Sequence, residues 1–339
     1  MRRLRPWLRI LVVPSLALCG AVLGWLADDS VVASMVLLVE PVLWVAACWL
    51  AYAALLRGDT ALALRICFGA VAAAASARIP RPPAEAAGVD AAPFAERTRA
   101  CARGLPLPTS TVRVLQWTLS SDHEGVVAAV TEAAPDIAIV RGALTPGEVV
   151  ALGAALGGEV LSLGRDPMVQ VFSRGSFDLC GEADSWNDTP ATGTALGLVF
   201  VSLPGATIPL VTATLPELGS VGDWESSLRA GRAALRSTVD SLGSSLLLVS
   251  IDAPLPLAGP RLAATLRTVQ LLPVSRAPNW PAWPLPLHTW DQLWAADAWL
   301  GAPAKMVTTS GPTRAGTMVE LTPRWPVVLP TTGNDDPVR

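Results

Sequence analysis

The residues whose types suit chemistry are a few carboxylates and one imidazole. Asp252 follows a buried apolar run, Asp291 lies further along the chain, and Asp122, His123 and Glu124 are consecutive in a polar stretch. Carboxylate oxygens and an imidazole together hold divalent ions such as Mg²⁺ or Mn²⁺. In the alternative interpretation, Asp252 caps the turn of its Asp-Ala-Pro sequence and His123 is a solvated loop residue. We favour the second interpretation, so we expect no metal or other cofactor.

Other routes to chemistry are missing from the sequence. It has no GxSxG nucleophile motif, no phosphate-binding P-loop and no GxGxxG motif after a strand. The five cysteines form no CxxC or cysteine–histidine cluster, which argues against a structural zinc site. Cys101 and Cys180 lie outside the apolar N-terminal segments, and the sequence leaves open whether they pair.

Short apolar runs alternate with helical patterns from residue 111 onward. Strands are predicted at residues 112–119, 136–140, 169–173, 195–202, 208–215 and 245–251. Helices are predicted at residues 124–134, 148–156 and 224–242. This pattern predicts one α/β domain at residues 111–325, long enough for a large core. The Pro- and Ala-rich residues 79–110 predict a linker, and residues 326–339 a disordered tail.

Several of these segments resemble, in order, the motifs of the endonuclease/exonuclease/phosphatase superfamily. Residues 113–119, RVLQWTL, are similar to its opening strand RVLSWNV, and residues 135–142, PDIAIVRG, to PDIVLLQE. Residues 171–174 resemble its ILSR segment, and residues 246–254, LLLVSIDAP, resemble LVVGDFNAP. Residues 286–291 and 310–321 lie where its closing motifs occur. The resemblance covers residues 111–323 and implies a four-layered α/β/β/α sandwich.

The same resemblance implies metal-assisted attack of water on a phosphate ester, but this chain departs from the family at most catalytic positions. The first Asn, the metal-holding Glu and the mid-chain His fall at Thr118, Gly142 and Thr214. The remaining catalytic positions fall at Ser250, at Asp252 and near Thr313 and Arg314. Asp291 alone matches in type, and in the family that residue orients the missing His. The resemblance therefore implies a pseudoenzyme with a binding or scaffolding role.

An alternative keeps an enzymatic function. In it, Asp252, Asp291 and Glu124 form a new metal site, and the chain is a diverged Mg²⁺- or Mn²⁺-dependent phosphatase or phosphodiesterase. Its substrates would be lipid-linked or extracellular phosphate esters.

Two further features suit a binding role. Arg314, in a cleft without metal, fits phosphate or carboxylate as a bidentate clamp, although a surface arginine is the simpler interpretation. Five tryptophans interleaved with prolines suit a sugar, a lipid headgroup, an extended peptide or the membrane interface. They are Trp280, Trp283, Trp290, Trp294 and Trp299. We favour core and loop packing for these tryptophans.

The first 78 residues predict a membrane anchor. The whole chain is 51% hydrophobic and only 16% charged, whereas soluble domains carry about 25% charged residues. Apolar runs at 7–27, 31–56 and 60–77 each have the length of a transmembrane helix. Glu40 falls inside the second run, where it is either a functional carboxylate or a protonated or helix-facing residue; we favour the latter.

Charge asymmetry predicts the orientation of this anchor. Arg2, Arg3, Arg5 and Arg9 keep the N-terminus in the cytoplasm, so three crossings of a bacterial inner membrane place the α/β domain outside. The anchor also makes the chain similar to a bacterial membrane subgroup of the superfamily. The expected partners are the lipid bilayer and an extracytoplasmic ligand or protein. With a formal net charge of -3, nucleic acid is not expected.

Overall fold

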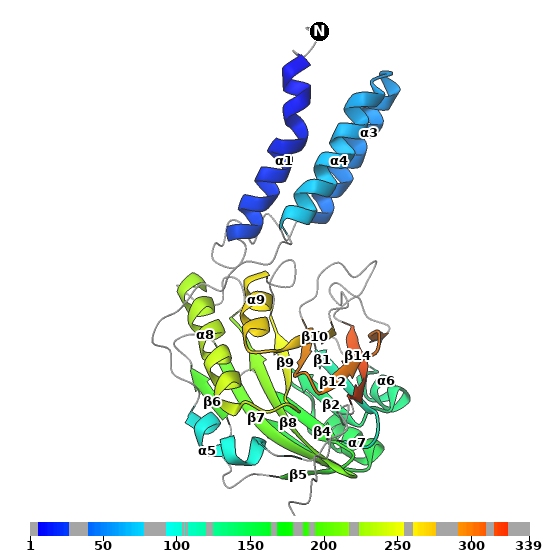
Figure 1. The fold of residues 1–339 in the computed structure, drawn as a ribbon. Helices are drawn as coiled ribbons and strands as arrows, with labels where there is room; N and C mark the ends of the chain where they lie inside the picture. The colour runs from blue at the N-terminus through cyan, green and yellow to red at the C-terminus, as the bar shows by residue number, and fades with distance from the viewer. Residues whose placement is uncertain are drawn as a thin grey trace, which may run out of the picture.

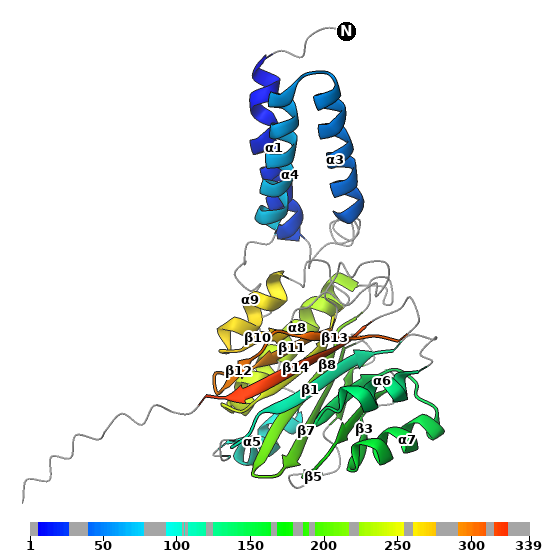
Figure 2. The ribbon, with the colours of Figure 1, turned by 90° about the vertical axis from the view of Figure 1, so that its right-hand side faces the viewer.

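The computed structural model describes most of the chain. The described residues are 6–26, 40–77, 93–103, 105, 108–119, 125–163, 168–178, 186–189, 194–216, 224–253, 260–275, 291–309 and 315–324. They form an N-terminal group of helices and an α/β domain with two mixed β-sheets (Figures 1 and 2). The predictions for Asp122, His123, Glu124, Thr313, Arg314 and the tail 326–339 lie outside the described residues.

The first sheet contains the strands that carry the opening and closing motifs. Its strands are β1 (Val112–Thr118), β2 (Ile137–Arg141), β3 (Glu159–Leu163), β4 (Val169–Ser173), β12 (Trp299–Gly301), β13 (Lys305–Val307) and β14 (Gly316–Pro323). The strand order is β12-β14-β1-β2-β4-β3, and β13 also pairs with β14. Strands β1 and β2 are parallel, with Thr118 opposite Arg141, so both side chains lie at the same end of the sheet.

The second sheet contains the remaining strands. They are β5 (Ser176–Asp178), β6 (Trp186–Thr189), β7 (Thr194–Leu203), β8 (Ala206–Thr214), β9 (Leu248–Asp252), β10 (Leu272–Ser275) and β11 (Asp291–Ala295). Their order is β10-β11-β9-β8-β7-β5, with β6 on β7. Strands β8 and β9 are parallel, which places Thr214 opposite Asp252.

Three apolar cores divide the domain into four layers. Alternate residues of each strand point to opposite faces, and the central core between the sheets takes Val114, Ile139, Leu210 and Leu248. Helices α6 (Val126–Ala133) and α7 (Pro146–Leu156) cover the outer face of the first sheet. Helices α5 (Pro93–Ala102), α8 (Trp224–Leu242) and α9 (Pro260–Thr268) cover the second. The predicted sandwich fold is therefore confirmed for the domain.

The start of helix α7 shows how the sequence fixes one of these elements. Thr145 is the N-cap, and its side chain accepts a hydrogen bond from the backbone N–H of Glu148. The Glu148 carboxylate in turn accepts from the Thr145 backbone N–H at 2.8 Å. This reciprocal capping box satisfies N–H groups that have no partner inside the helix, and Pro146 follows the N-cap, where a proline has no N–H to lose.

The structure corrects the predicted linker. Residues 93–102 form helix α5, which packs on α8 through Ala95 and Ala102, both fully buried. Thr98 is also buried, so positions 95, 98 and 102 form one face at helical spacing. The Pro and Ala content of the segment concealed this short periodic pattern.

One end of α5 is held covalently. Cys101 is disulfide-bonded, while Cys19, Cys48 and Cys67 are free. Cys180, the candidate partner from the sequence, lies outside the described residues.

The N-terminal helices are α1 (Pro6–Leu26), α3 (Glu40–Leu56) and α4 (Thr60–Ala77), and α4 packs against both of the others. They overlap the three apolar runs predicted to cross a membrane. Over the residues that the structure describes, none of the helices has the length and apolarity of a membrane span. The prediction of three transmembrane helices is thus not supported, and Glu40 lies at the start of α3.

Candidate functional site

Polar side chains replace the apolar core at one end of the space between the two sheets. The residues of β1, β2 and β14 that point inward change there from valine and isoleucine to Gln116, Thr118, Arg141 and Thr317. The second sheet contributes Thr212 and Thr214 from β8, Ser250 and Asp252 from β9, and Asp291 from β11. We call these nine residues the inter-sheet polar cluster. All except Thr118, which is half-buried, are buried.

Arg141 joins the two sheets within this cluster. Arg141 is only 1% exposed. The Nη2 atom of its guanidinium donates to both the carbonyl oxygen and the Oγ of Ser250 at 2.8 Å. The Ser250 hydroxyl donates in turn to Gln116 Oε1 at 3.0 Å. A chain of hydrogen bonds therefore runs from β2 through β9 to β1, and a positive charge lies inside the domain because arginine stays protonated in proteins.

Two carboxylates meet near this arginine. Asp252 and Asp291 are register partners of the antiparallel strands β9 and β11, and they are 5% and 0% exposed. Thr118 Oγ1 donates to Asp291 Oδ1 at 2.5 Å, which links β1 to β11. The register therefore brings two buried carboxyl groups together at the end of β9 and the start of β11.

Gly142 departs furthest from a metal-ligand position. Its φ angle is +113°, a conformation that residues with a Cβ rarely adopt. A Cβ built there lies 3.2 Å from Leu119 Cβ and 3.4 Å from the Leu119 carbonyl oxygen. A carboxylate side chain at this position would therefore strain the backbone.

The side chains present do not fit the metal site of the resembling hydrolases. Thr118, Gly142, Thr214 and Ser250 supply no carboxylate or imidazole. Within the described ranges, no three His, Cys, Asp or Glu residues gather where they would hold an ion. Asp252 and Asp291 do come together, and Glu124, the third predicted ligand, lies outside those ranges.

The structure describes two of the five tryptophans that the sequence interleaves with prolines. Trp294 and Trp299 are fully buried, and their indole N–H groups donate to Gln292 Oε1 and to the Leu246 carbonyl oxygen. For these two, core packing is confirmed. Trp280, Trp283 and Trp290 lie outside the described residues.

Sequence reasoning missed four members of the cluster, which are Arg141, Gln116, Thr212 and Thr317. Arg141 had a signal, because residues 137, 139 and 141 share one face of a strand and the first two are isoleucines. A charge in that series indicates a buried, specifically bonded side chain. Gln116 and Thr317 are register partners on β1 and β14, a pairing that the sequence alone does not contain.

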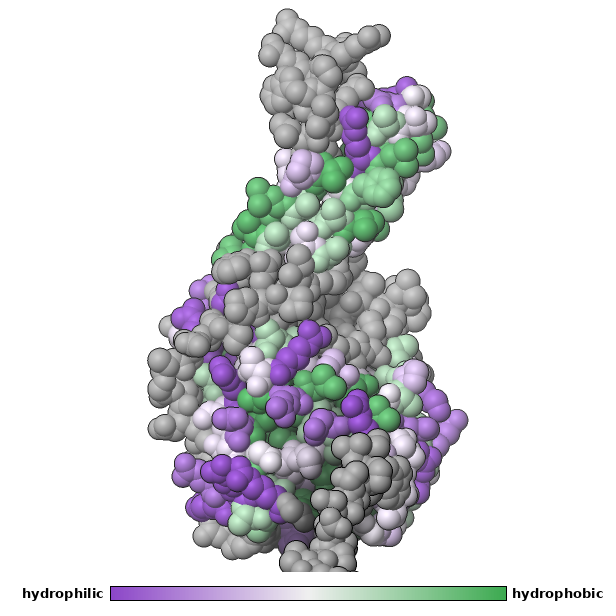
Figure 3. All heavy atoms as spheres, in the orientation of Figure 1, coloured by the Kyte–Doolittle hydropathy of each residue, from purple (hydrophilic) through white to green (hydrophobic). Residues whose placement is uncertain are grey.

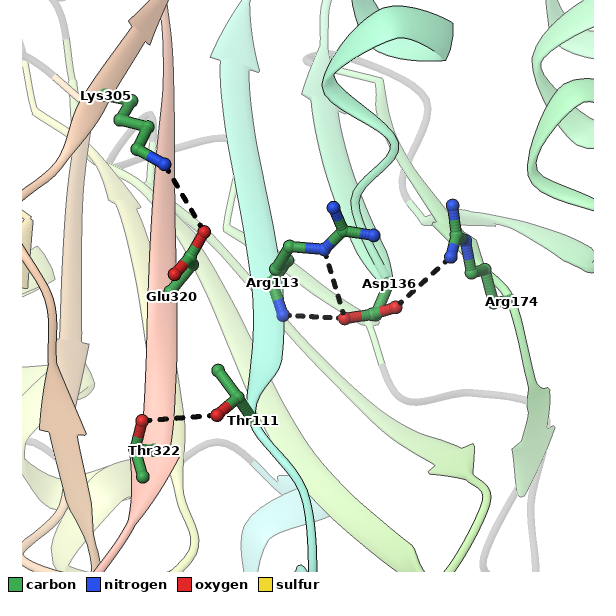
Figure 4. A network of polar contacts seen from close by, with 7 residues as sticks. All are labelled: Thr111, Arg113, Asp136, Arg174, Lys305, Glu320 and Thr322. Atoms are coloured by element: carbon green, nitrogen blue, oxygen red, sulfur yellow. Dashed lines mark hydrogen bonds and ion pairs between the residues drawn. The ribbon is translucent and has the colours of Figure 1, made fainter.

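The far end of the same sheet shows a different, solvent-facing set of polar contacts (Figure 4). Asp136, just before β2, forms ion pairs with Arg113 and Arg174 at 3.9 and 3.7 Å. Lys305 contacts Glu320 at 3.4 Å, and the hydroxyls of Thr111 and Thr322 lie 3.3 Å apart. Exposed pairs of this kind contribute little to stability, so we look for the functional site in the inter-sheet polar cluster.

No family model and no curated protein matches the sequence. Solved structures do match. An endonuclease/exonuclease/phosphatase family protein from Bacteroides thetaiotaomicron is 12% identical, covers 64% of this chain and 99% of its own, and has a TM-score of 0.50. An endonuclease/exonuclease/phosphatase from Beutenbergia cavernae is 14% identical over 63% of this chain and 72% of its own, with a TM-score of 0.47. A mannosyl-6-phosphatase from B. thetaiotaomicron is 12% identical over 62% of this chain and 99% of its own, also with a TM-score of 0.47. The described domain has the fold of the endonuclease/exonuclease/phosphatase family.

Proposed function

We propose that this domain has lost metal-dependent phosphoester hydrolysis and serves a binding or scaffolding role through the inter-sheet polar cluster. The observation that carries the proposal is the pair Arg141 and Gly142. Where the resembling hydrolases have a metal-holding carboxylate, this chain has a glycine at φ +113°, and the preceding residue directs a buried guanidinium to Ser250. A fixed positive charge inside a cleft repels a divalent cation, most strongly where water does not screen it.

The binding role is supported by polar groups of the cluster that lack protein partners. The Gln116 amide nitrogen and the hydroxyls of Thr212, Thr214 and Thr317 are buried and have no hydrogen-bond partner among the described residues. Native proteins satisfy nearly all such groups with protein, water or ligand. In the proposed binding role, a polar group of the ligand satisfies these buried groups.

Metal-dependent turnover tests the loss of hydrolysis. The full chain in detergent is incubated with Mg²⁺ or Mn²⁺ and with p-nitrophenyl phosphate or bis(p-nitrophenyl) phosphate, and nitrophenolate release is followed. We expect no release above that of the buffer with metal. Metal-dependent release that Asp252→Ala abolishes would contradict the proposal, because that variant removes a carboxylate and leaves Arg141 in place.

One observation favours the diverged hydrolase as a second candidate. Asp252 and Asp291 lie side by side in register within the inter-sheet polar cluster, and two adjacent carboxylates are a common start of an Mg²⁺ or Mn²⁺ site. In this candidate Glu124 supplies the third ligand, and lipid-linked or extracellular phosphate esters are the substrates. The turnover assay with Asp252→Ala separates the two candidates directly.

We further propose that the N-terminal helices bind a lipid bilayer. Large apolar side chains point outward from all three, including Leu18, Trp49 and Phe68, which are 66%, 67% and 65% exposed. Figure 3 shows hydrophobic residues gathered over the described part of these helices. Contiguous exposed apolar surface of this kind is rare on proteins without a partner or membrane.

The proposed location of the domain is the extracytoplasmic face of a bacterial inner membrane. The disulfide of Cys101 supports this side, because disulfides persist in oxidising compartments and are rare in the cytoplasm.

Flotation with vesicles of phosphatidylethanolamine and phosphatidylglycerol tests the lipid proposal. We expect the full chain to float and a Leu18→Ser/Trp49→Ser/Phe68→Ser variant to lose most of its binding. Val150→Ser is the matched control, because Val150 is equally exposed but lies on α7 of the domain. Equal flotation of the triple variant and the unchanged chain would overturn the proposal.

A further inference from the structure

Arg141 is an unusual residue for the centre of an α/β sandwich, because it is charged, fully buried and bonded across the two sheets. Its Nη2 donates to two oxygens of Ser250, and Ser250 donates to Gln116, so three strands from both sheets are linked through Ser250. A buried charge is tolerated only where hydrogen bonds and opposite charges compensate it. The contacts to Ser250 supply the hydrogen bonds, and Asp252 and Asp291 are the acidic members of the same cluster.

We propose that the Arg141 guanidinium replaces the divalent cation of this fold's hydrolases as the positive charge of the cleft, and thereby excludes metal from it. This inference rests on the proposed loss of metal-dependent hydrolysis and assigns that loss to one residue. The chemistry is a substitution of one cation by another: both attract the oxygen ligands that face the cleft, but an arginine is covalently fixed and always protonated.

The position of Ser250 supports the assignment. Ser250 is where the resembling motif has its first aspartate, and a serine there presents a neutral oxygen to the guanidinium. With an aspartate at 250, an arginine at the same distance would form a buried ion pair and would still occupy the carboxylate. The arginine therefore blocks this ligand position whether residue 250 is serine or aspartate, and only its removal releases it.

Gly142 supports the assignment from the other side. This position has no carboxylate that could hold a metal ion, and its backbone has a conformation that suits glycine. Arg141 and Gly142 are adjacent, so one short segment at the end of β2 both removes a ligand and adds a cation.

Binding of Mn²⁺, followed by its enhancement of water proton relaxation, tests the inference without any substrate. The variants of the full chain in detergent are Ser250→Asp, Arg141→Gln/Ser250→Asp and the matched control Arg113→Gln/Ser250→Asp. Arg113 is also on the first sheet but is one-third exposed and paired with Asp136. We expect saturable Mn²⁺ binding in the Arg141→Gln/Ser250→Asp variant, and at least tenfold weaker binding in the unchanged chain, in Ser250→Asp and in the control.

The outcomes separate this inference from the proposed function. Equal Mn²⁺ affinity in Ser250→Asp and the double variant, or no saturable binding in a folded double variant, overturns the role of Arg141 and leaves the loss of hydrolysis standing. Saturable, Asp252-dependent binding in the unchanged chain contradicts both.

If the double variant does not fold, the melting temperatures of Arg141→Lys and Arg141→Gln decide. If the charge is what matters, the melting temperature falls less in Arg141→Lys than in Arg141→Gln. Equal falls in the two variants overturn the inference.

Discussion

Gly142 provides no side-chain ligand for a metal ion, and its backbone has a conformation that favours glycine. Its φ of +113° and the 3.2 Å approach of a Cβ to Leu119 mean that any side chain there must displace its surroundings. Restoring a metal-ligand carboxylate at this position is therefore opposed by the backbone itself.

We expect Gly142→Glu to lower the free energy of unfolding by about 1–3 kcal/mol, the usual cost of holding a side chain in a sparsely populated backbone conformation. Urea denaturation followed by circular dichroism measures it. Gly147→Glu is the matched control, because nothing lies within 4 Å of a Cβ there and the position is in the first turn of α7. A loss in the control as large as that in Gly142→Glu would contradict the argument.

Thr118 offers a second prediction at the scale of one side chain. Its hydroxyl donates to the fully buried carboxylate of Asp291, and hydrogen bonds to charged groups contribute about 1.5–3 kcal/mol. Thr118→Val keeps the shape and removes the donor, so we expect a loss of unfolding free energy in that range.

The control for Thr118 lies on the same sheet. Thr111, just before β1, shares an exposed hydroxyl contact with Thr322, and Thr111→Val is expected to change stability by less than about 0.5 kcal/mol. Equal effects of the two substitutions in urea denaturation would show that the contact to Asp291 is not special.

Among the elements, helix α7 shows how local sequence fixes a boundary. Its capping box joins Thr145 and Glu148, and loss of an N-cap costs about 1 kcal/mol. We expect Thr145→Ala to reduce the unfolding free energy by that amount. Thr131→Ala in α6 is the control: its exposed hydroxyl only donates to the Val127 carbonyl of its own helix, so alanine there is neutral or stabilising. Equal unfolding free energies of the two variants in urea denaturation would contradict the role of the Thr145 cap.

Elements with strong local patterns were predicted from the sequence, and the others were not. The apolar runs of β1, β2, β4, β7, β8 and β9 and the amphipathic pattern of α8 lie within a few residues of their predicted bounds. Strands β10, β12 and β13 have only three or four residues, too few for a period to appear. They exist because a neighbouring strand supplies hydrogen bonds, which is a tertiary effect.

The candidate site was predictable in part for the same reason. Asp252 was expected directly after a buried apolar run, and it is the last residue of β9, while Asp291 is the first residue of β11. Their pairing in register, and the reach of Arg141 from one sheet to Ser250 on the other, depend on how distant segments stack. No local pattern contains that information, although the charge among the isoleucines of β2 marks the residue to examine.

At the scale of the whole molecule, the disulfide of Cys101 crosslinks the end of α5 to another segment of the chain. Cys101→Ser is expected to lower the free energy of unfolding by roughly 2–5 kcal/mol, because the open chain gains conformational freedom when unfolded. Guanidinium denaturation of the domain transition measures it. Cys67→Ser is the control, because Cys67 is free and exposed on α4. An unchanged transition midpoint in Cys101→Ser would mean that the crosslink does not stabilise the domain.

The same crosslink determines how the domain bears mechanical load. If the N-terminal helices are held in place and the domain is pulled away from them, tension enters the domain through α5. Because Cys101 is disulfide-bonded, this tension divides at residue 101 between the crosslink and the backbone that continues to β1. Strand β1, which carries Thr118, therefore receives only part of the load that arrives along α5.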